Sequence, residues 1–258
     1  FKSSASAPVV QRLSATGTAP WLVQFAGAIR EDRKAALENT GAAIRGYIPE
    51  TGFLVEAPPR QISQIAAGAD VVWIGEYLPA YKQAKAVREW RPGDPEEARE
   101  FRVQVLGMEG KDRVMRELGE MNAPISPEAA RSASASFRTW LAPQQVAEVA
   151  NWGEVEWIEF RHPARSWGTS FPGAAAAGAP DDLEAALRQA FAAGERVRAV
   201  IRGVADAGGY GADARAVDRF VWEHPEMLVV AAAGNAAGDL DPADGGADAG
   251  SGGSPAAA

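Results

Sequence analysis

The chain has 258 residues, of which 47% are hydrophobic, so it is long enough to bury one large core or two smaller ones. Its 26 basic and 34 acidic residues give a net charge of -8 without a dense Lys/Arg block, which argues against a nucleic-acid or membrane partner. No apolar run approaches the ~20 residues that cross a bilayer. Cysteine is absent, which excludes disulfides, thiol nucleophiles and Cys-ligated zinc. We expect a soluble globular protein.

The amino terminus reads FKSSASAPVVQRLSATGTAP. It lacks a charged region followed by an apolar one, so no signal peptide is visible. Because the first residue is Phe1, we expect a processed product or an excised fragment. We expect residues 1–20 to form a disordered arm.

Two stretches of the chain repeat one pattern at a spacing of roughly 80 residues. FLVEAPPRQISQIA at 53–66 is matched by FRTWLAPQQVAEVA at 137–150, and each is followed by a strand that contains Trp-Ile. The strands upstream, WLVQF and FRVQVL, also correspond. The repeat predicts two copies of one unit, which we call the first module (residues 21–80) and the second module (residues 99–160).

The first module reads as strand, helix, strand, strand, helix, strand. WLVQF is β-rich, REDRKAALENTG is a charged helix that stops at Gly41, and AAIRGYIPETGFLVEA is two strands about a turn. PPRQISQIAAGAD begins with prolines, which the first turn of a helix tolerates, and ends at Gly68 before the strand VVWIGEYL. This βαββαβ order is that of the ferredoxin-like fold.

The second module follows the same plan, with GKDRVMRELGEMN and PQQVAEVANWG as its helices, although APISPEAARSAS is less clearly a strand. Between the modules, residues 81–98 are charged and contain Pro-Gly-Asp-Pro, which predicts a linker. The predicted fold class of the two modules is α+β, and we expect them to pack side by side.

The third region changes character to α/β. RHPARSWGTSFPGAAAAGAP is typical of a loop, and DDLEAALRQAFAAG is typical of a helix that Asp181 or Asp182 caps. The strand RVRAVIRG, the helix GADARAVDRFVWEHP and the strand MLVVAAAG follow. Alternating helices and apolar strands indicate a parallel sheet covered by helices over residues 161–235. Residues 236–258 have little to bury, which predicts a disordered tail.

The stretch HPEMLVVAAAGNAAGD resembles the A-A-G-N corner of the subtilisin-like (subtilase) serine proteases, with Asn235 as the asparagine. The two helices before it and the tail GSGGSPAAA are similar to that family's catalytic core, and the two modules resemble its ferredoxin-like propeptide domains. The resemblance implies that Asn235 donates to the oxyanion of acyl transfer, a contact worth about 3 to 4 kcal/mol of barrier. Without the resemblance, the interpretation of Asn235 is a residue at the end of a strand that turns the chain beside glycine.

The resemblance also implies an Asp in a D-T/S-G turn, a His in H-G-T-H and a Ser in G-T-S-M-A, with the asparagine between His and Ser. No D-T-G or D-S-G occurs in the sequence. The two histidines, His162 and His224, are not followed by Gly-Thr. We interpret His224 as a helix-end residue and His162 as a surface or packing residue. We therefore expect no triad-dependent proteolysis.

The stretch SWGTSF precedes Asn235, where the family's nucleophile would follow it. On one interpretation Ser170 is the nucleophile. On the other, Ser166, Trp167 and Gly168 correspond to the family's S-W-G stretch, whose backbone pairs with substrate.

The sequence has no motif for an organic cofactor, because GVADAGGYG fits neither a dinucleotide nor a phosphate-loop pattern. The acidic stretch from Asp239 to Asp248 offers carboxylates to Ca²⁺ but lacks the spacing of an EF-hand. Eight tryptophans are present, and we expect those at strand positions, such as Trp73 and Trp157, in the core.

Two main functional hypotheses follow. In the first, the chain is a catalytically incomplete subtilisin-like endopeptidase, with a peptide or protein substrate and a secreted location by resemblance. In the second, it is a propeptide-like module that binds a protease domain as inhibitor or chaperone. A structural remnant without activity and an unrelated enzyme on a ferredoxin-like platform are two further hypotheses.

Overall fold

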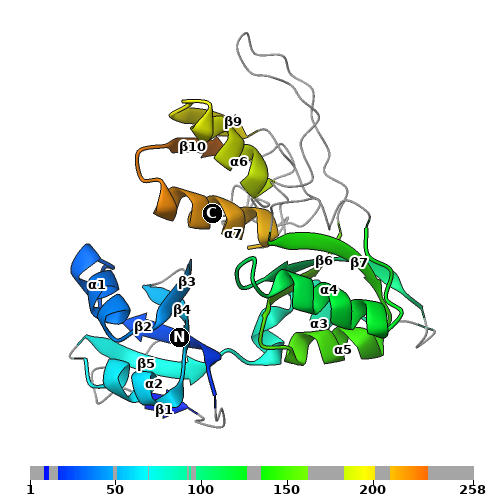
Figure 1. Ribbon diagram of the computed structural model, residues 1–258, viewed down its shortest axis with the longest axis horizontal. Coiled ribbons are helices and arrows are strands. Elements are labelled where there is room, and N and C mark those ends of the chain that lie inside the picture. Colours follow the sequence, from blue (N-terminus) through cyan, green and yellow to red (C-terminus); the bar gives the residue numbers. More distant parts are fainter. Residues whose placement is uncertain are drawn as a thin grey trace, which may run out of the picture.

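The computed structural model describes a chain of mixed α/β architecture, with antiparallel sheets and several helices. In Figure 1 the two modules lie below, and a C-terminal unit, by which we mean residues 183–200 and 210–231, lies above them. No helix within the described residues is long and apolar enough to cross a membrane. The described residues are 9–11, 17–48, 51–68, 70–91, 93, 97–126, 135–161, 183–200 and 210–231.

A five-stranded sheet carries the first module. Its elements are β1 (Val9–Gln11), β2 (Ala19–Phe25), α1 (Glu31–Asn39), β3 (Ala43–Ile48), β4 (Gly52–Ala57), α2 (Pro59–Ala66) and β5 (Val71–Glu76). The strand order is β1-β5-β2-β4-β3, in which β2 runs antiparallel to β4 and β5 and β1 runs parallel to β5. Strand β1 and the start of β2 lie within residues 1–20, so this part of the arm that the sequence suggested was disordered is paired in the sheet.

Local sequence explains where the two helices of the first module begin and end. Helix α1 ends at Asn39, two residues before Gly41, whose φ of +82° favours glycine and whose N–H donates to the Glu38 carbonyl over 2.9 Å. Helix α2 starts at Pro59, a position where the missing N–H costs nothing. Both helices cover one face of the sheet, whose buried core is Trp21, Val23, Phe25, Leu37, Ala42, Phe53, Val55, Ala57, Ile62, Ile65, Val71 and Ile74.

The second module is built on a three-stranded antiparallel sheet of order β7-β6-β8. Its elements are β6 (Arg99–Val105), α4 (Lys111–Glu120), β7 (Ser136–Leu141), α5 (Pro143–Asn151) and β8 (Val155–Phe160). The two predicted helices are confirmed. Ile125 forms a bridge to Thr139 beside β7, and residues 127–134 of the less clear stretch lie outside the described residues.

Part of the predicted linker 81–98 is folded onto the second module. A 3-10 helix η1 (Pro79–Lys82) and a short helix α3 (Lys85–Arg88) follow β5. Gln83 bridges to Ile158, and Val87 is buried in the core of the second module. Because most residues of this segment are charged or polar, the sequence does not indicate that Val87 is buried. The sequence therefore predicted only a linker here.

The modules also touch each other directly. Leu54 and Tyr77 of the first module and Leu106 of the second form a small buried cluster. Beside it, Arg45 makes ion pairs with Glu56 of its own module at 2.6 Å and with Glu109 of the second module at 2.7 Å. The direct interface is therefore small compared with the core of either module.

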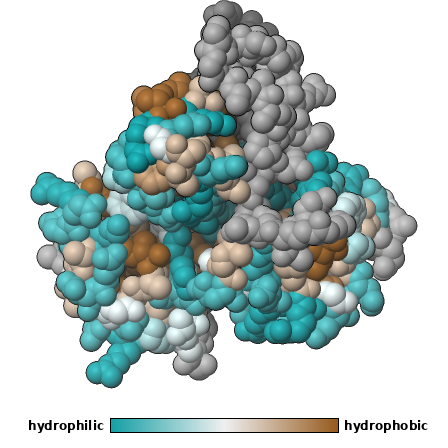
Figure 2. Space-filling model, turned by 45° about the horizontal axis from the view of Figure 1, so that its top comes forward, coloured by the Kyte–Doolittle hydropathy of each residue, from teal (hydrophilic) through white to brown (hydrophobic). Residues whose placement is uncertain are grey.

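The C-terminal unit consists of α6 (Leu183–Ala192), β9 (Val197–Val200), α7 (Ala212–Glu223) and β10 (Leu228–Ala231). Strands β9 and β10 pair in parallel, as the alternation of helix and strand predicts. The helices cover one face of this pair, and the other face exposes Val197 and Leu228, which are 64% and 58% accessible. Figure 2 shows apolar atoms gathered at the top of the molecule, where β9 and β10 lie in Figure 1. The unit's buried core is Leu183, Leu187, Ala190, Val200, Val217, Phe220 and Met227.

Candidate functional site: helix α7 on the two modules

The residues singled out by the protease resemblance fall outside the described part of the chain. This holds for Asn235, for Ser170 and for the S-W-G residues Ser166, Trp167 and Gly168. The roles inferred for them therefore stay predictions.

Two further candidates of the sequence also fall there. His162 and the acidic stretch 239–248, considered for Ca²⁺, lie outside the described residues. Within the described residues, no group of three or more His, Asp or Glu side chains could hold a metal ion.

Two other sequence candidates are described, with different outcomes. His224 caps the C-terminal end of α7, where its ring lies 4.1 Å from that of Phe191, so its interpretation as a helix-end residue is confirmed. Trp157, expected in the core, is only half-buried, and the Arg215 guanidinium lies 5.0 Å above its ring. Its indole N–H donates to the Glu159 carboxylate over 3.0 Å. Trp157 thus belongs to a polar surface.

That polar surface is the face of the second module's sheet that α4 and α5 do not cover. Along β6 and β8, side chains such as Val103 and Ile158 are buried in the core. The alternate positions carry Arg102 and Glu159, which oppose each other in the strand register. Because successive side chains in a strand point to opposite faces, one sequence pattern gives an apolar face and a charged one. Helix α7 lies on the charged face.

The N-terminal end of α7 is held by this charged face. The Glu159 carboxylate accepts a hydrogen bond from the backbone N–H of Ala212 over 2.9 Å. Arg102 donates to the Asp213 carboxylate over 2.7 Å and to the Ser136 hydroxyl over 2.9 Å. The first N–H groups of a helix have no partner within it and carry partial positive charge, so Glu159 supplies the acceptor that Gly211, the N-cap, cannot.

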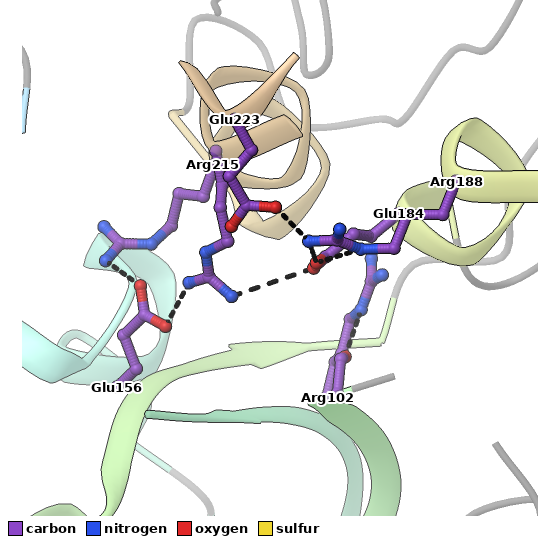
Figure 3. A network of polar contacts seen from close by, with 8 residues as sticks. Arg102, Glu156, Glu184, Arg188, Arg215 and Glu223 are labelled. Atoms are coloured by element: carbon purple, nitrogen blue, oxygen red, sulfur yellow. Dashed lines mark hydrogen bonds and ion pairs between the residues drawn. The ribbon is translucent and has the colours of Figure 1, made fainter. Parts of the chain in front are cut away.

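One turn further along α7, a buried carboxylate joins two arginines. Glu156 accepts from Arg215 over 2.8 Å and also from Arg219 (Figure 3). Their side chains are 3%, 9% and 12% exposed, respectively. Burial alone would raise the pKa of Glu156, but the charges of Arg219 and Arg215 outweigh it and lower this pKa. The carboxylate is therefore held in its charged form between two charged partners.

The arginine pair continues into a network between α6 and α7. Arg219 lies 3.7 Å from the Glu184 carboxylate, and Arg188 donates to both Glu184 and Glu223 (Figure 3). The surface ends of this network are partly exposed, where ion pairs contribute little to stability. The buried contacts around Glu156 therefore dominate its energetics.

The C-terminal end of α7 contacts the first module through Trp222. Its ring is stacked on Tyr47 with centroids 6.2 Å apart and meets Phe53 edge-on at 5.5 Å. The Lys34 ammonium lies 5.0 Å above the same ring. Arg215, Arg219 and Trp222 are spaced i, i+4 and i+7, so they share one face of the helix. One stripe of α7 thus contacts both modules.

Lys82, the last residue of η1, is a buried charge that lies against the second module. It is 2% exposed and donates to the Trp152 carbonyl. Burial lowers its pKa from 10.5 to about 8, against the opposing effect of Glu154. Because the pKa is lower in the folded state, the unfolded chain binds more protons between these two values, and stability rises with pH in that window.

We predict that Lys82→Met removes this pH dependence. The shift from 10.5 to about 8 corresponds to about 3 kcal/mol of destabilisation below pH 8 that disappears as pH approaches 10.5. In urea titrations from pH 7 to pH 10, the stability of the variant relative to the parent should fall by about 2 to 3 kcal/mol. Subtracting the parent curve removes the opposing effect of Tyr77, whose pKa burial raises in both proteins. A difference that stays constant with pH would contradict the assignment.

The contact of α7 with the second module was not predicted from the sequence, although two signals of it were present. Glu156 and Glu159 interrupt an otherwise apolar strand, VEWIEF, and Arg215 and Arg219 are spaced by four residues on a predicted helix. Neither signal indicates which residues pair with each other, because the hydrogen-bonded pairs are 59 and 63 residues apart in the sequence. The geometry is that of a docking surface for a helix.

Comparisons with known proteins find a similarity only for the first part of the chain. Residues 2–78, which contain β1 to β5, are similar to a family described as a domain of unknown function (DUF8729). No curated protein and no solved structure matches the chain.

Proposed function

We propose that the chain is a catalytically incomplete relative of the subtilisin-like serine proteases, in which two propeptide-like modules hold a segment of the protease core. The observation that carries this proposal is the position of α7. This helix belongs to the segment that resembles the protease core, and it is held by Glu156 and Glu159 of the second module and by Tyr47 and Phe53 of the first.

The proposal includes a ferredoxin-like fold for both modules. In the first module, strands β2 to β5 have the order β5-β2-β4-β3, with helices α1 and α2 in the connections between β2 and β3 and between β4 and β5. This is the order expected of two interleaved βαβ units. In the second module, β7-β6-β8 has the corresponding order, with the bridge at Ile125 next to β7.

The chemistry of the α7 contact supports a binding role for the modules. The second module has its own apolar core, to which α7 contributes no side chain, and it meets α7 through charged groups. Such a polar contact resembles the interface between two partners more than the interior of one domain. A module that grips a helix in this way suits an inhibitor or chaperone of the protease core.

Turnover of a chromogenic peptide and labelling by a fluorophosphonate probe test the catalytic part of the proposal. We expect neither from the purified chain, because the sequence lacks the D-T/S-G and H-G-T-H motifs. Asn235→Ala and Ser170→Ala serve as paired variants. Turnover and labelling that disappear in Ser170→Ala would show a rearranged triad and overturn this part.

Inhibition of an added subtilisin tests the binding part. If the modules bind protease helices, weakening the α7 contact by Trp222→Ala should free their surface and strengthen inhibition relative to the parent chain. The control is Leu228→Ala, which removes an apolar side chain 58% exposed on the other side of the unit. Equal absence of inhibition in all three proteins at micromolar concentration would reject the inhibitory role.

A further inference from the structure

We propose that α7 is a two-ended latch that fixes the first and second modules relative to each other, so that releasing one end weakens the other. The inference uses only the contacts of α7 and does not depend on the chain being a protease relative. Figure 1 shows α7 lying above both modules, with its two ends toward different ones.

The two ends of the latch are chemically different. At the N-terminal end, Arg215 and Arg219 meet Glu156, and the Ala212 N–H meets Glu159. At the C-terminal end, Trp222 lies among Tyr47, Phe53 and Lys34. Trp222 is seven positions after Arg215, which is about 10 Å along a helix axis. One rigid element thus spans from an ionic contact to an aromatic one.

The ionic end depends on exclusion of water. Glu156, Arg215 and Arg219 are each at most 12% exposed, and charges attract far more strongly when desolvated than in water. If Trp222 loses its place on the first module, α7 is anchored at one end only, and water gains access to the ion pairs. The electrostatic contact then weakens without any change to its own residues.

The direct contact between the modules involves few residues of either module. It includes the cluster of Leu54, Tyr77 and Leu106, the hydrogen bond from the Tyr77 hydroxyl to the Glu156 carbonyl over 2.9 Å, and the ion pairs of Arg45. The Glu109 partner of Arg45 is 65% exposed, so that pair is screened by solvent. We therefore expect the angle between the modules to be set mainly by α7.

Because the sequence contains no cysteine, spin labels can be attached at chosen positions to follow the arrangement of the modules. Ser63 on α2 and Ala147 on α5 are exposed and belong to different modules. Spin labels on Ser63→Cys and Ala147→Cys report the distribution of distances between the modules in the full chain. The exchange rate of the Ala212 amide, bonded to Glu159, reports the ionic end in the same proteins.

Trp222→Ala should broaden the distance distribution and speed exchange of the Ala212 amide about tenfold or more, although the substitution lies ten residues away. Trp222→Phe, which keeps a ring, and Leu228→Ala, which has no part in the latch, should resemble the parent. If Trp222→Ala unfolds the chain, the distance distribution and the Ala212 exchange rate are measured in Trp222→Leu, and the same results are expected. An unchanged distribution, or a broadened one with unchanged exchange at Ala212, would overturn the latch.

Discussion

Glu156→Gln should lower the free energy of unfolding by about 3 to 5 kcal/mol, the largest loss that we expect of a polar substitution among the described residues. The amide keeps the shape of the carboxylate but removes its charge. Arg215 then stays buried without a counter-ion, and Arg219 keeps only the Glu184 carboxylate 3.7 Å away. The amide NH₂ also faces an arginine, a group that can only donate. The loss reflects the uncompensated charge of Arg215 and the weakened compensation of Arg219 more than the strength of the original pairs.

Urea unfolding of the variant beside a matched control measures this effect. Glu148→Gln changes an exposed carboxylate on α5 of the same module and should alter stability by no more than about 0.5 kcal/mol. Replacing Glu156, Arg215 and Arg219 together by apolar residues of similar size should recover most of the loss, because these three positions then hold no unpaired buried charge. A loss below about 1 kcal/mol for Glu156→Gln would mean that water reaches the arginines.

The pH dependence of the same pair of proteins provides an independent check. The pKa of Glu156 is lower in the folded state than its ordinary value of 4.5. Its contribution to stability is therefore fully present above pH 4.5 and is lost as pH falls through the folded-state pKa. The parent and Glu156→Gln should thus differ most near neutral pH and converge in acid, because a protonated Glu156 carries no more charge than the amide.

Much of the modules could be predicted from the sequence because their signals are local. The repeat of FLVEAPPRQISQIA and FRTWLAPQQVAEVA marks β4 with α2 and β7 with α5. Pro59 and Pro143 occupy the first turn of each helix, and Gly41 supplies the positive φ after α1. Each of these features is set by a few neighbouring residues, so periodicity and turn chemistry find it.

What the sequence could not give depends on contacts between distant segments. Strand β1 has three residues and is stabilised by pairing with β5, more than 60 residues away in the chain. Val87 lies in a charged segment and is buried only because the second module covers it. Sequence reasoning placed function at Asn235 through a resemblance, whereas the described contacts gather on α7, whose partners are Glu156 and Tyr47.

Phe220→Ala should cost about 3 to 5 kcal/mol, and the loss should fall on the C-terminal unit. Phe220 is fully buried, and its ring meets Phe191 edge-on at 6.2 Å and lies 4.8 Å from that of His224. It is the largest side chain in the small core shared by α6, α7, β9 and β10. A core of this size contributes little to the free energy of unfolding. The energetic cost of the cavity that a phenyl ring leaves exceeds that contribution.

Hydrogen exchange resolves where the stability is lost. Amides of residues 183–200 and 210–231 should lose protection in Phe220→Ala, while those of β2 and β6 keep it, because Phe53 and Phe101 lie in separate cores. Phe191→Ala, at a half-buried ring of the same cluster, should show the same pattern with a smaller loss. Equal loss of protection across the whole chain would contradict this division. It would mean that unfolding of the C-terminal unit also unfolds the two modules, so that the modules do not fold independently of α7.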